Sequence, residues 1–205
     1  MKLIDGIKNT GRPFNIPDAS RDDLPAFLVE MGFNVGAEIG TSKGRYAELF
    51  GKAGLKLYCI DPWLDYPDYC RGDERWQHDL DKQYNQTKEL LSPYDCILIR
   101  KKSMDALADI PDESLDFVYI DGNHEFLYAL NDIHEWSKKV KKGGIISGHD
   151  YFRSNPHGFE IIKVKEAVDA YTNIYGIDNW YVIGARDKKE GEKRDNFRSF
   201  MWIKK

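Results

Sequence analysis

Acidic and histidine residues follow two successive apolar segments in the second half of the sequence. Asp121 and His124 come after the first segment, and His149 and Asp150 come after the second. Carboxylate oxygens and imidazole nitrogens are ligands for divalent cations such as Mg²⁺ and Mn²⁺. A histidine, whose ordinary pKa lies near neutrality, can also take a proton from a hydroxyl group. These four residues therefore predict metal binding or proton transfer at one site.

We predict that Asp121, His149 and Asp150 hold the cation and that His124, together with Asp121, is catalytic. Simpler interpretations exist for each of these side chains. Asp150 could cap the segment that follows it, and His149 could bond only to backbone groups. His124 could stand at a helix start and hydrogen-bond Asp121.

A glycine-containing turn in the first half of the sequence predicts a cofactor site. This turn contains Glu38, Gly40, Thr41, Ser42 and Gly44, between a short apolar run and a helix-forming segment. The glycines permit a sharp turn and a close approach to a ligand, and the helix start offers free N–H groups. The spacing differs from the dinucleotide pattern G-x-G-x-x-G, and the acid before the first glycine suits a ligand with a cationic amino-acid end. S-adenosylmethionine is such a ligand, although an ordinary glycine turn is the alternative.

Two further positions extend the predicted cofactor site. Asp61 lies about twenty residues beyond the glycines, the distance at which an acid accepts hydrogen bonds from ribose hydroxyls. It also precedes Pro62, and Asp-Pro is a common turn pair. Ser103 and Met104 follow the next apolar segment and could line an adenine slot, while Ser103 could equally be a helix N-cap.

Aromatic residues gather in two loops that we expect at the same edge of the fold. They are Trp63, Tyr66, Tyr69, Tyr151 and Phe152. An aromatic slot would suit a ring in the acceptor, such as a phenol or the apolar face of a sugar. The alternative is that these loops only pack small clusters of their own.

Apolar runs alternate with helix-forming segments and so predict the elements that position these residues. The predicted strands are Val35–Ile39, Leu57–Ile60, Cys96–Ile99, Leu115–Ile120, Gly144–Ser147, Trp180–Ile183 and Phe200–Ile203. The predicted helices are 22–31, 44–53, 73–91, 103–109, 125–140 and 159–175. This alternation predicts an α/β fold, a Rossmann-like, mostly parallel sheet with helices on both faces and a terminal antiparallel hairpin. Ligands bind such sheets beyond the carboxyl ends of the strands, where the candidate residues lie.

Length and composition narrow the class of protein. A chain of 205 residues suits one domain, and we expect an irregular arm within 1–20, an arm-and-helix region over 1–31, and the main domain over 32–205. A net charge of −4 argues against nucleic acid as a partner. Three widely spaced cysteines and the lack of a signal-like or membrane-length apolar run predict a cytoplasmic protein without membrane insertion. The arm could pack on a neighbouring subunit in a homo-oligomer.

From about Gly32 to the C-terminus, the chain resembles the class I S-adenosylmethionine-dependent methyltransferases. Tyr58–Trp63, Asp116–His124 and Gly143–Tyr151 are similar to bacterial small-molecule O-methyltransferases, a group that includes macrocin-type and polysaccharide-modifying enzymes related to catechol and caffeoyl-CoA O-methyltransferases. The resemblance implies a seven-stranded sheet whose final strand is reversed.

The resemblance also implies roles for individual residues. Glu38, Gly40 and Gly44 would meet the methionine part of the cofactor, Asp61 the ribose, and Ser103 with Met104 the adenine. In the catechol enzymes, an acid after the fourth strand and an Asp-Asn pair after the fifth hold a metal. Here His149 and Asp150 stand at the pair, and the histidine shifts the expected preference toward a softer ion. His124 stands where those enzymes have a lysine base.

The resulting prediction is methyl transfer from S-adenosylmethionine to a hydroxyl of a small acceptor, such as a sugar, a glycan or a natural product, with Mg²⁺ or Mn²⁺ as an optional cofactor. Metal-independent N- or C-methylation is the nearest alternative. A nicotinamide-dependent oxidoreductase and a non-catalytic cofactor-binding protein stay open as other classes.

Overall fold

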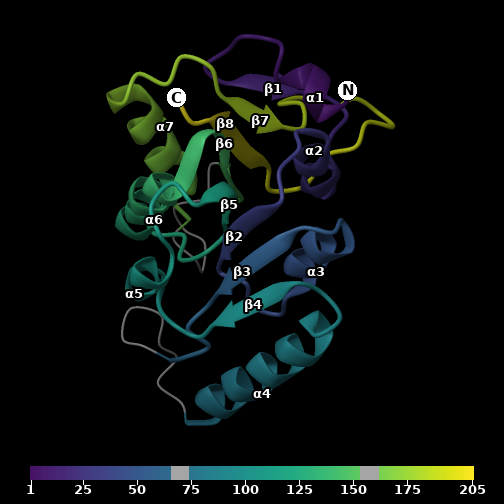
Figure 1. Ribbon diagram of the computed structural model, residues 1–205. Coiled ribbons are helices and arrows are strands. Elements are labelled where there is room, and N and C mark those ends of the chain that lie inside the picture. Colours follow the sequence, from purple (N-terminus) through teal and green to yellow (C-terminus); the bar gives the residue numbers. More distant parts are fainter. Residues whose placement is uncertain (66–73, 153–161) are drawn as a thin grey trace.

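The apolar runs of the sequence form the strands of one mixed sheet with helices on both faces (Figure 1). The computed structural model describes residues 1–65, 74–152 and 162–205. The strands are β1 (Phe14–Ile16), β2 (Val35–Ile39), β3 (Lys56–Ile60), β4 (Cys96–Ile99), β5 (Leu115–Ile120), β6 (Val140–Gly148), β7 (Tyr181–Ile183) and β8 (Ser199–Ile203). The predicted α/β architecture is therefore confirmed.

The strand order is β1-β7-β8-β6-β5-β2-β3-β4. β8 runs antiparallel to both of its neighbours, β6 and β7, and all the other pairs are parallel. This confirms the reversed final strand and the terminal hairpin. The chain proceeds outward from β2 in one direction through β3 and β4, and then returns to β5 on the other side of β2. The carboxyl ends of β2 and β5 therefore flank the point at which an open sheet of this kind binds its ligands.

Within the described residues the sheet has eight strands, so the expected number of seven was one too few. The additional strand, β1, comes from the N-terminal segment that we expected to be irregular. Phe14, Asn15 and Ile16 pair with Tyr181, Val182 and Ile183 of β7. A run of three residues followed by a proline is too short to carry the alternating pattern that identifies a strand. The segment that we expected to be available for a neighbouring subunit thus extends the chain's own sheet.

Two groups of helices cover the two faces of the sheet (Figure 1). One face carries α5 (Ser103–Ala106), α6 (Phe126–Lys139) and α7 (Val164–Ile174). The other carries α1 (Leu3–Gly6), α2 (Leu24–Glu30), α3 (Arg45–Lys52) and α4 (Glu74–Leu91). Short 3-10 turns, η1 (Arg21–Asp23) and η3 (Leu107–Asp109), precede α2 and follow α5. The first residues of the predicted helix 159–175 lie outside the described residues.

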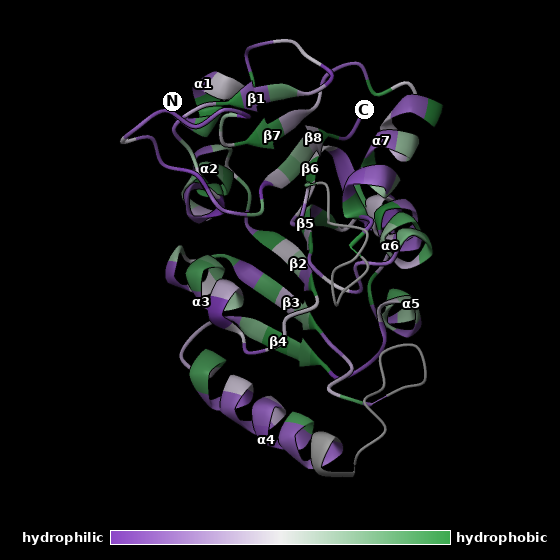
Figure 2. Cartoon of the chain, turned by 180° about the vertical axis from the view of Figure 1, so that it is seen from behind, coloured by the Kyte–Doolittle hydropathy of each residue, from purple (hydrophilic) through white to green (hydrophobic). Residues whose placement is uncertain are grey.

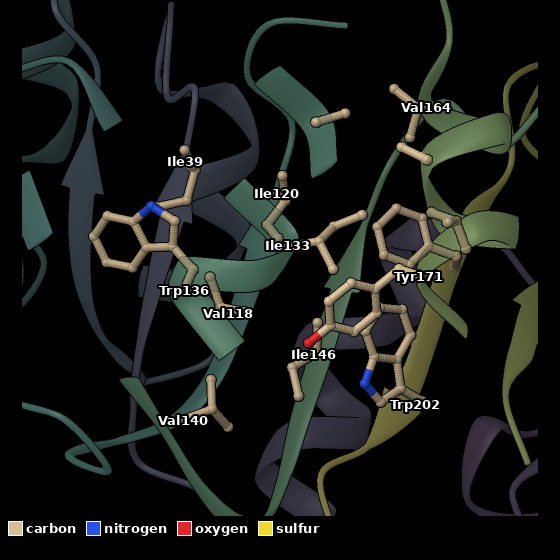
Figure 3. Packing of buried hydrophobic residues seen from close by; sticks show 14 of the residues in the cluster. Ile39, Val118, Ile120, Ile133, Trp136, Val140, Ile146, Val164, Tyr171 and Trp202 are labelled. Carbon is tan, nitrogen blue, oxygen red and sulfur yellow. The ribbon is translucent and has the colours of Figure 1, made fainter. Parts of the chain in front are cut away.

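In helix α6, the apolar residues that recur at helical spacing are the ones that pack against the sheet. Ala129, Ile133 and Trp136 recur at helical spacing and are buried against the sheet. Figure 3 shows Ile133 and Trp136 among side chains that rise from the strands, including Val118 and Ile146. Truncation of a fully buried tryptophan costs about 3–5 kcal/mol, so Trp136 is a main anchor of this layer.

The distribution of hydropathy agrees with this layered packing (Figure 2). Hydrophobic residues concentrate in the strands, and α4 is largely hydrophilic where it faces solvent. Among the described helices, none combines the length and the apolar character that crossing a membrane requires.

Candidate active site

The turn after β2 is held in place by backbone groups and by α4. The Gly40 N–H donates to the Ile60 carbonyl at 2.8 Å. The Ser42 carbonyl accepts hydrogen bonds from Trp63 Nε1 and Thr87 Oγ1, both at 2.9 Å. Ser42 adopts a left-handed backbone conformation with φ 49°, which is uncommon outside glycine. Several independent bonds therefore fix the turn before any ligand arrives.

Asp61 at the end of β3 is part of the same structure. Its Oδ2 accepts a hydrogen bond from the Ser42 N–H at 2.9 Å, and its Oδ1 accepts one from the Trp63 N–H at 2.8 Å. Burial raises the pKa of Asp61, although these two N–H groups act against that shift. Each carboxylate oxygen keeps a further lone pair, so Asp61 can still accept hydrogen bonds from hydroxyl groups of a ligand.

Gly40 brings the turn after β2 into contact with the end of β5. A Cβ at Gly40 would lie 2.1 Å from the Asp121 carbonyl oxygen, and its φ of +90° also favours glycine. At Gly44, where φ is +71°, a Cβ would lie 2.8 Å from Thr87 Cγ2. Because Gly40 and Gly44 have no side chain, the turn can pack closely against the end of β5 and against α4. The glycines therefore serve this packing in addition to the expected turn.

Three residues of the predicted cofactor site, Glu38, Thr41 and Gly44, are not part of the wall of the cavity that is described below. Within the described residues, Glu38 Oε2 and Thr41 Oγ1 are buried without a hydrogen-bond partner. Burial, followed by the charge of Asp121, raises the pKa of Glu38 well above its ordinary value. Contact between these three residues and a cofactor stays a prediction.

Ser103 opens α5 and turns its hydroxyl toward α6. Ser103 Oγ donates to Asp132 Oδ1 and accepts a hydrogen bond from Trp136 Nε1 at 2.7 Å. Burial raises the pKa of Asp132 to about 7 in spite of the serine. Asp132 was not among the residues predicted from the sequence. Its spacing from Ala129 and Trp136 on the apolar face of α6 is the signal that could have identified it.

A single cavity of about 480 Å³ joins the predicted cofactor residues to the predicted catalytic residues. Gly40, Ser42, Asp61, Ser103 and Met104 line it, together with Asp121 and His124. Trp63, Tyr128 and Asp132 also contribute to its wall. The fold has therefore brought together residues from the ends of four strands.

Asp121 and His124, which line this cavity, form a compact charged group with Asp150. His124 Nε2 lies 3.0 Å from Asp150 Oδ2 and 3.6 Å from Asp121 Oδ1. The potential ligand atoms of all three residues lie within 4.8 Å of one another. Asp150 has a left-handed φ of 60°, and such conformations in residues other than glycine concentrate at functional sites.

The charges of this group shift its protonation strongly. Burial acts to lower the pKa of His124, but Asp121 and Asp150 outweigh it and raise the pKa to about 10. Burial likewise acts to raise the pKa of Asp150, but His124 and His149 outweigh it and hold this pKa well below its usual range. In the free protein at neutral pH, an imidazolium therefore lies between two carboxylates.

His149, the predicted third metal ligand, lies beside Asp150 but is not part of the compact three-residue group. Its Nδ1 lies 3.2 Å from Asp150 Oδ1, and its Nε2 is buried without a hydrogen-bond partner within the described residues. The three-residue group contains His124 in its place. Two carboxylates and an imidazole suit a divalent cation, and His124 Nε2, also buried without a well-aligned hydrogen bond, is available as a ligand.

Arg21 is a further member of the site that the sequence analysis missed. Its Nη1 lies 3.6 Å from Asp121 Oδ2, and its guanidinium lies over the Tyr46 ring at 5.0 Å. The backbone N–H of Arg21 donates to Asp195 Oδ2 at 2.6 Å. The backbone carbonyl of Arg21 accepts a hydrogen bond from Tyr46 Oη at 2.7 Å. No local pattern predicts these contacts, because they depend on how distant segments pack.

The predicted aromatic slot is present only in part. Trp63 and Tyr151 are buried, and Phe152 stacks on Phe197 with ring centroids 4.3 Å apart. Tyr66 and Tyr69 lie outside the described residues. Of the described aromatic residues in that prediction, Trp63 lines the cavity.

Comparison with known proteins identifies the family of this fold. Residues 37–151 match a family model described as a methyltransferase domain, which covers more than half of the chain. The matched segment contains the turn after β2, Asp61, Ser103 and the whole charged group.

Solved methyltransferase structures share the fold. An O-methyltransferase from Bacillus cereus in complex with SAH is 12% identical, with a TM-score of 0.61 over 89% of this chain and 80% of that one. An O-methyltransferase from Streptomyces achromogenes involved in tomaymycin synthesis is 11% identical, with a TM-score of 0.58 over 90% and 79%. An rRNA methylase from Streptococcus thermophilus is 14% identical, with a TM-score of 0.58 over 88% and 93%. At these identities the likeness concerns the fold, and the neighbours differ in their substrates.

Curated relatives carry no described activity. An uncharacterized protein of Sinorhizobium fredii is 25% identical over 139 residues, which are 67% of this chain and 14% of that protein. An uncharacterized protein of Acanthamoeba polyphaga mimivirus is 29% identical over 92 residues, 44% of this chain and 41% of that protein. The chain thus spans less than half the length of either relative.

Proposed function

This chain belongs to the methyltransferase domain family, and we propose that it transfers a methyl group from S-adenosylmethionine to a hydroxyl of a small acceptor such as a sugar, a glycan or a natural product. One observation carries this proposal. The cavity that contains the cofactor residues Gly40, Ser42 and Asp61 also contains Asp121 and His124. A donor and an acceptor held in one cavity react as if intramolecularly, which supplies much of the rate enhancement of a methyl transfer.

The cofactor would lie across the ends of β2, β3 and β4. Gly40 and Ser42 would border its methionine part, and Asp61 would accept hydrogen bonds from the ribose hydroxyls. Ser103 and Met104 would border the adenine. The B. cereus neighbour, which shares the fold, was solved in complex with SAH, and this supports a cofactor of that kind.

His124 would take the proton from the acceptor hydroxyl while the oxygen attacks the sulfonium methyl group. Asp121 and Asp150 would stabilise the resulting imidazolium, since both carboxylates face His124 Nε2. The base must first be neutral, and the pKa of about 10 in the free protein opposes this. The positive charge of a bound sulfonium in the same cavity would lower that pKa and favour the neutral imidazole.

Asp121, His124 and Asp150 are also the residues that would hold a divalent cation, in place of the predicted set with His149. Such a cation, when bound, would lower the pKa of an acceptor hydroxyl near it. Coordination through His124 Nε2 would leave no lone pair for the proton. His124 therefore cannot be a metal ligand and the general base at the same time. We propose that it acts as the general base without a metal.

We also propose that the enzyme acts in the cytoplasm, because Cys59 and Cys96 are free thiols. Cys70 lies outside the described residues. A homo-oligomer stays a prediction, and the described part of the chain offers no further argument for it.

A screen of acceptors with labelled S-adenosylmethionine tests the function directly. Sugars, phenols and natural-product alcohols would be tried with Mg²⁺, with Mn²⁺ and with a chelator. We expect label in a methyl ether, with equal rates under all three conditions. Label in an amine or on carbon would overturn O-methylation. A rate that a chelator abolishes, and that Mn²⁺ restores, would overturn the metal-free role of His124.

The double variant Asp121→Asn with Asp150→Asn is the companion to this screen. It removes both carboxylates of the three-residue group and should abolish any stimulation by a cation. Substantial chelator-insensitive activity in this variant would exclude both the metal centre and the proposed stabilisation of the His124 imidazolium.

A further inference from the structure

A buried acid lines the cavity at a position that the proposed methyl transfer does not use. Asp132 lies on α6 and is 5% exposed, and it belongs to the cavity wall together with Ser103 and Met104. A carboxylate buried in an apolar layer costs free energy unless a hydrogen-bond donor compensates it. Its Oδ1 has such a donor in Ser103, whereas its Oδ2 has no partner within the part of the chain that the structure describes.

The direction of the hydrogen bonds around Asp132 is fixed by Trp136. An indole Nε1–H can only donate, so Ser103 Oγ must accept from Trp136 at 2.7 Å. The hydroxyl proton of Ser103 then goes to Asp132 Oδ1. Since Trp136 is completely buried, it cannot turn to solvent and release the serine.

Above about pH 7, where Asp132 is ionised, this chain of bonds leaves only acceptors toward the cavity. Ser103 Oγ keeps one lone pair, and Asp132 Oδ2 keeps its own. The nearby Gly122 gives the carboxylate room, because a Cβ at that position would lie 3.2 Å from Asp132 Oδ2. A ligand group that reaches this part of the cavity must therefore donate hydrogen bonds, and a group that only accepts would face unshared oxygen lone pairs.

We propose that Asp132, fixed by Ser103 and Trp136, binds the exocyclic amino group of the cofactor's adenine and selects adenine against 6-oxopurines. This inference rests on the proposed use of S-adenosylmethionine. Among the groups of that cofactor, the 6-amino group is the donor expected beside Ser103 and Met104. Asp132 would then be a specificity residue far from the methyl-transfer chemistry.

The test compares S-adenosylhomocysteine with S-inosylhomocysteine, in which a 6-oxo group replaces the 6-amino group. Calorimetric titration of the full chain well above pH 7, where Asp132 is ionised, should show that the adenosyl compound binds about ten- to a hundredfold more tightly, as expected where a mismatch leaves buried polar groups unpaired. In Asp132→Asn, the amide can donate to the 6-oxo group. The preference should therefore fall to less than threefold or reverse.

Asp105→Asn is the matched control, because Asp105 also lines the cavity but has no bond to Ser103. It should keep the preference of the wild type. A wild-type protein that binds both compounds equally would overturn the inference. Because this comparison needs no variant, the test remains decisive even if Asp132→Asn folds poorly. An unchanged preference in a folded Asp132→Asn would overturn it as well. Binding of neither compound would instead contradict the proposed function.

Discussion

On the proposed cofactor side of the cavity, Asp61 is held by two backbone N–H groups. On the proposed acceptor side, Asp121 faces the side chains of His124 and Arg21, and Asp150 faces His124. Backbone donors belong to the fold itself and stay in place when a side chain is replaced. The charged group on the acceptor side consists of side chains that can exchange protons or partners. The first arrangement suits binding of a constant cofactor, and the second suits chemistry on an acceptor.

The largest effect that separates the two sides is expected from His124→Ala. Loss of a general base lowers kcat by about 100- to 10,000-fold, while the affinity for S-adenosylhomocysteine should stay within twofold. Turnover of labelled S-adenosylmethionine and calorimetric binding measure the two quantities. His134→Ala, on the same stretch of chain but outside the cavity wall, is the control and should change neither. An equal loss of cofactor affinity in His124→Ala would show that His124 is not specific to the acceptor side.

Gly40→Ala should disturb both sides together, because Gly40 is where they touch. Its new Cβ would overlap the Asp121 carbonyl and would also sit at positive φ. We expect a loss of about 2–5 kcal/mol in the free energy of unfolding, measured with urea. Gly54→Ala has a similar φ of +85° with nothing within 4 Å, and it should cost only about 1 kcal/mol. Equal losses in the two variants would mean that contact between the two sides contributes nothing to stability.

Asp61→Asn should affect the cofactor side alone. The amide keeps the shape of the side chain but loses the charge that strengthens hydrogen bonds to the ribose and to the turn. We expect S-adenosylhomocysteine to bind about 10- to 100-fold more weakly, with kcat at saturation changed by less than threefold. A fall in kcat with unchanged binding would place Asp61 in the chemistry and remove the distinction between the two sides.

The smallest expected effect is the change in activity over one pH unit, and it concerns the acceptor side. Because the pKa of His124 is raised to about 10, the neutral imidazole in the free enzyme is scarce at neutral pH and becomes more abundant as pH rises. The value of kcat/KM should therefore increase about tenfold from pH 7 to pH 8 and level off near pH 10. His124→Gln should remove this slope from its residual activity. A decrease in kcat/KM above pH 7 would contradict the assignment of the base.

The contrast between the two sides of the cavity also explains which residues of the site could be predicted from the sequence. The turn after β2 and Asp61 lie close together along the chain, so their spacing alone indicates a shared site. Residues at the ends of β5 and β6 were likewise predictable, because parallel strands bring their carboxyl ends to one edge. Arg21 was not, since it reaches Asp121 only through the packing of the segment after β1. Asp132 carried a weak signal, an acid on the apolar face of a helix, which periodicity can reveal but which cannot specify its partners.

The choice between His124 and His149 in the three-residue group also needed the structure. Both histidines follow strand ends, and the sequence assigned only His149 to the metal ligands. Asp150, in a left-handed conformation, lies between the two rings, with Oδ2 toward His124 and Oδ1 toward His149.

Calorimetric titration of the purified chain with S-adenosylhomocysteine and, separately, with NAD tests the central claim most directly. The cavity that joins Asp61 to His124 should bind one S-adenosylhomocysteine per chain, and NAD should give no heat of binding. Binding of NAD without S-adenosylhomocysteine would contradict the claim and would favour an oxidoreductase built on the same sheet.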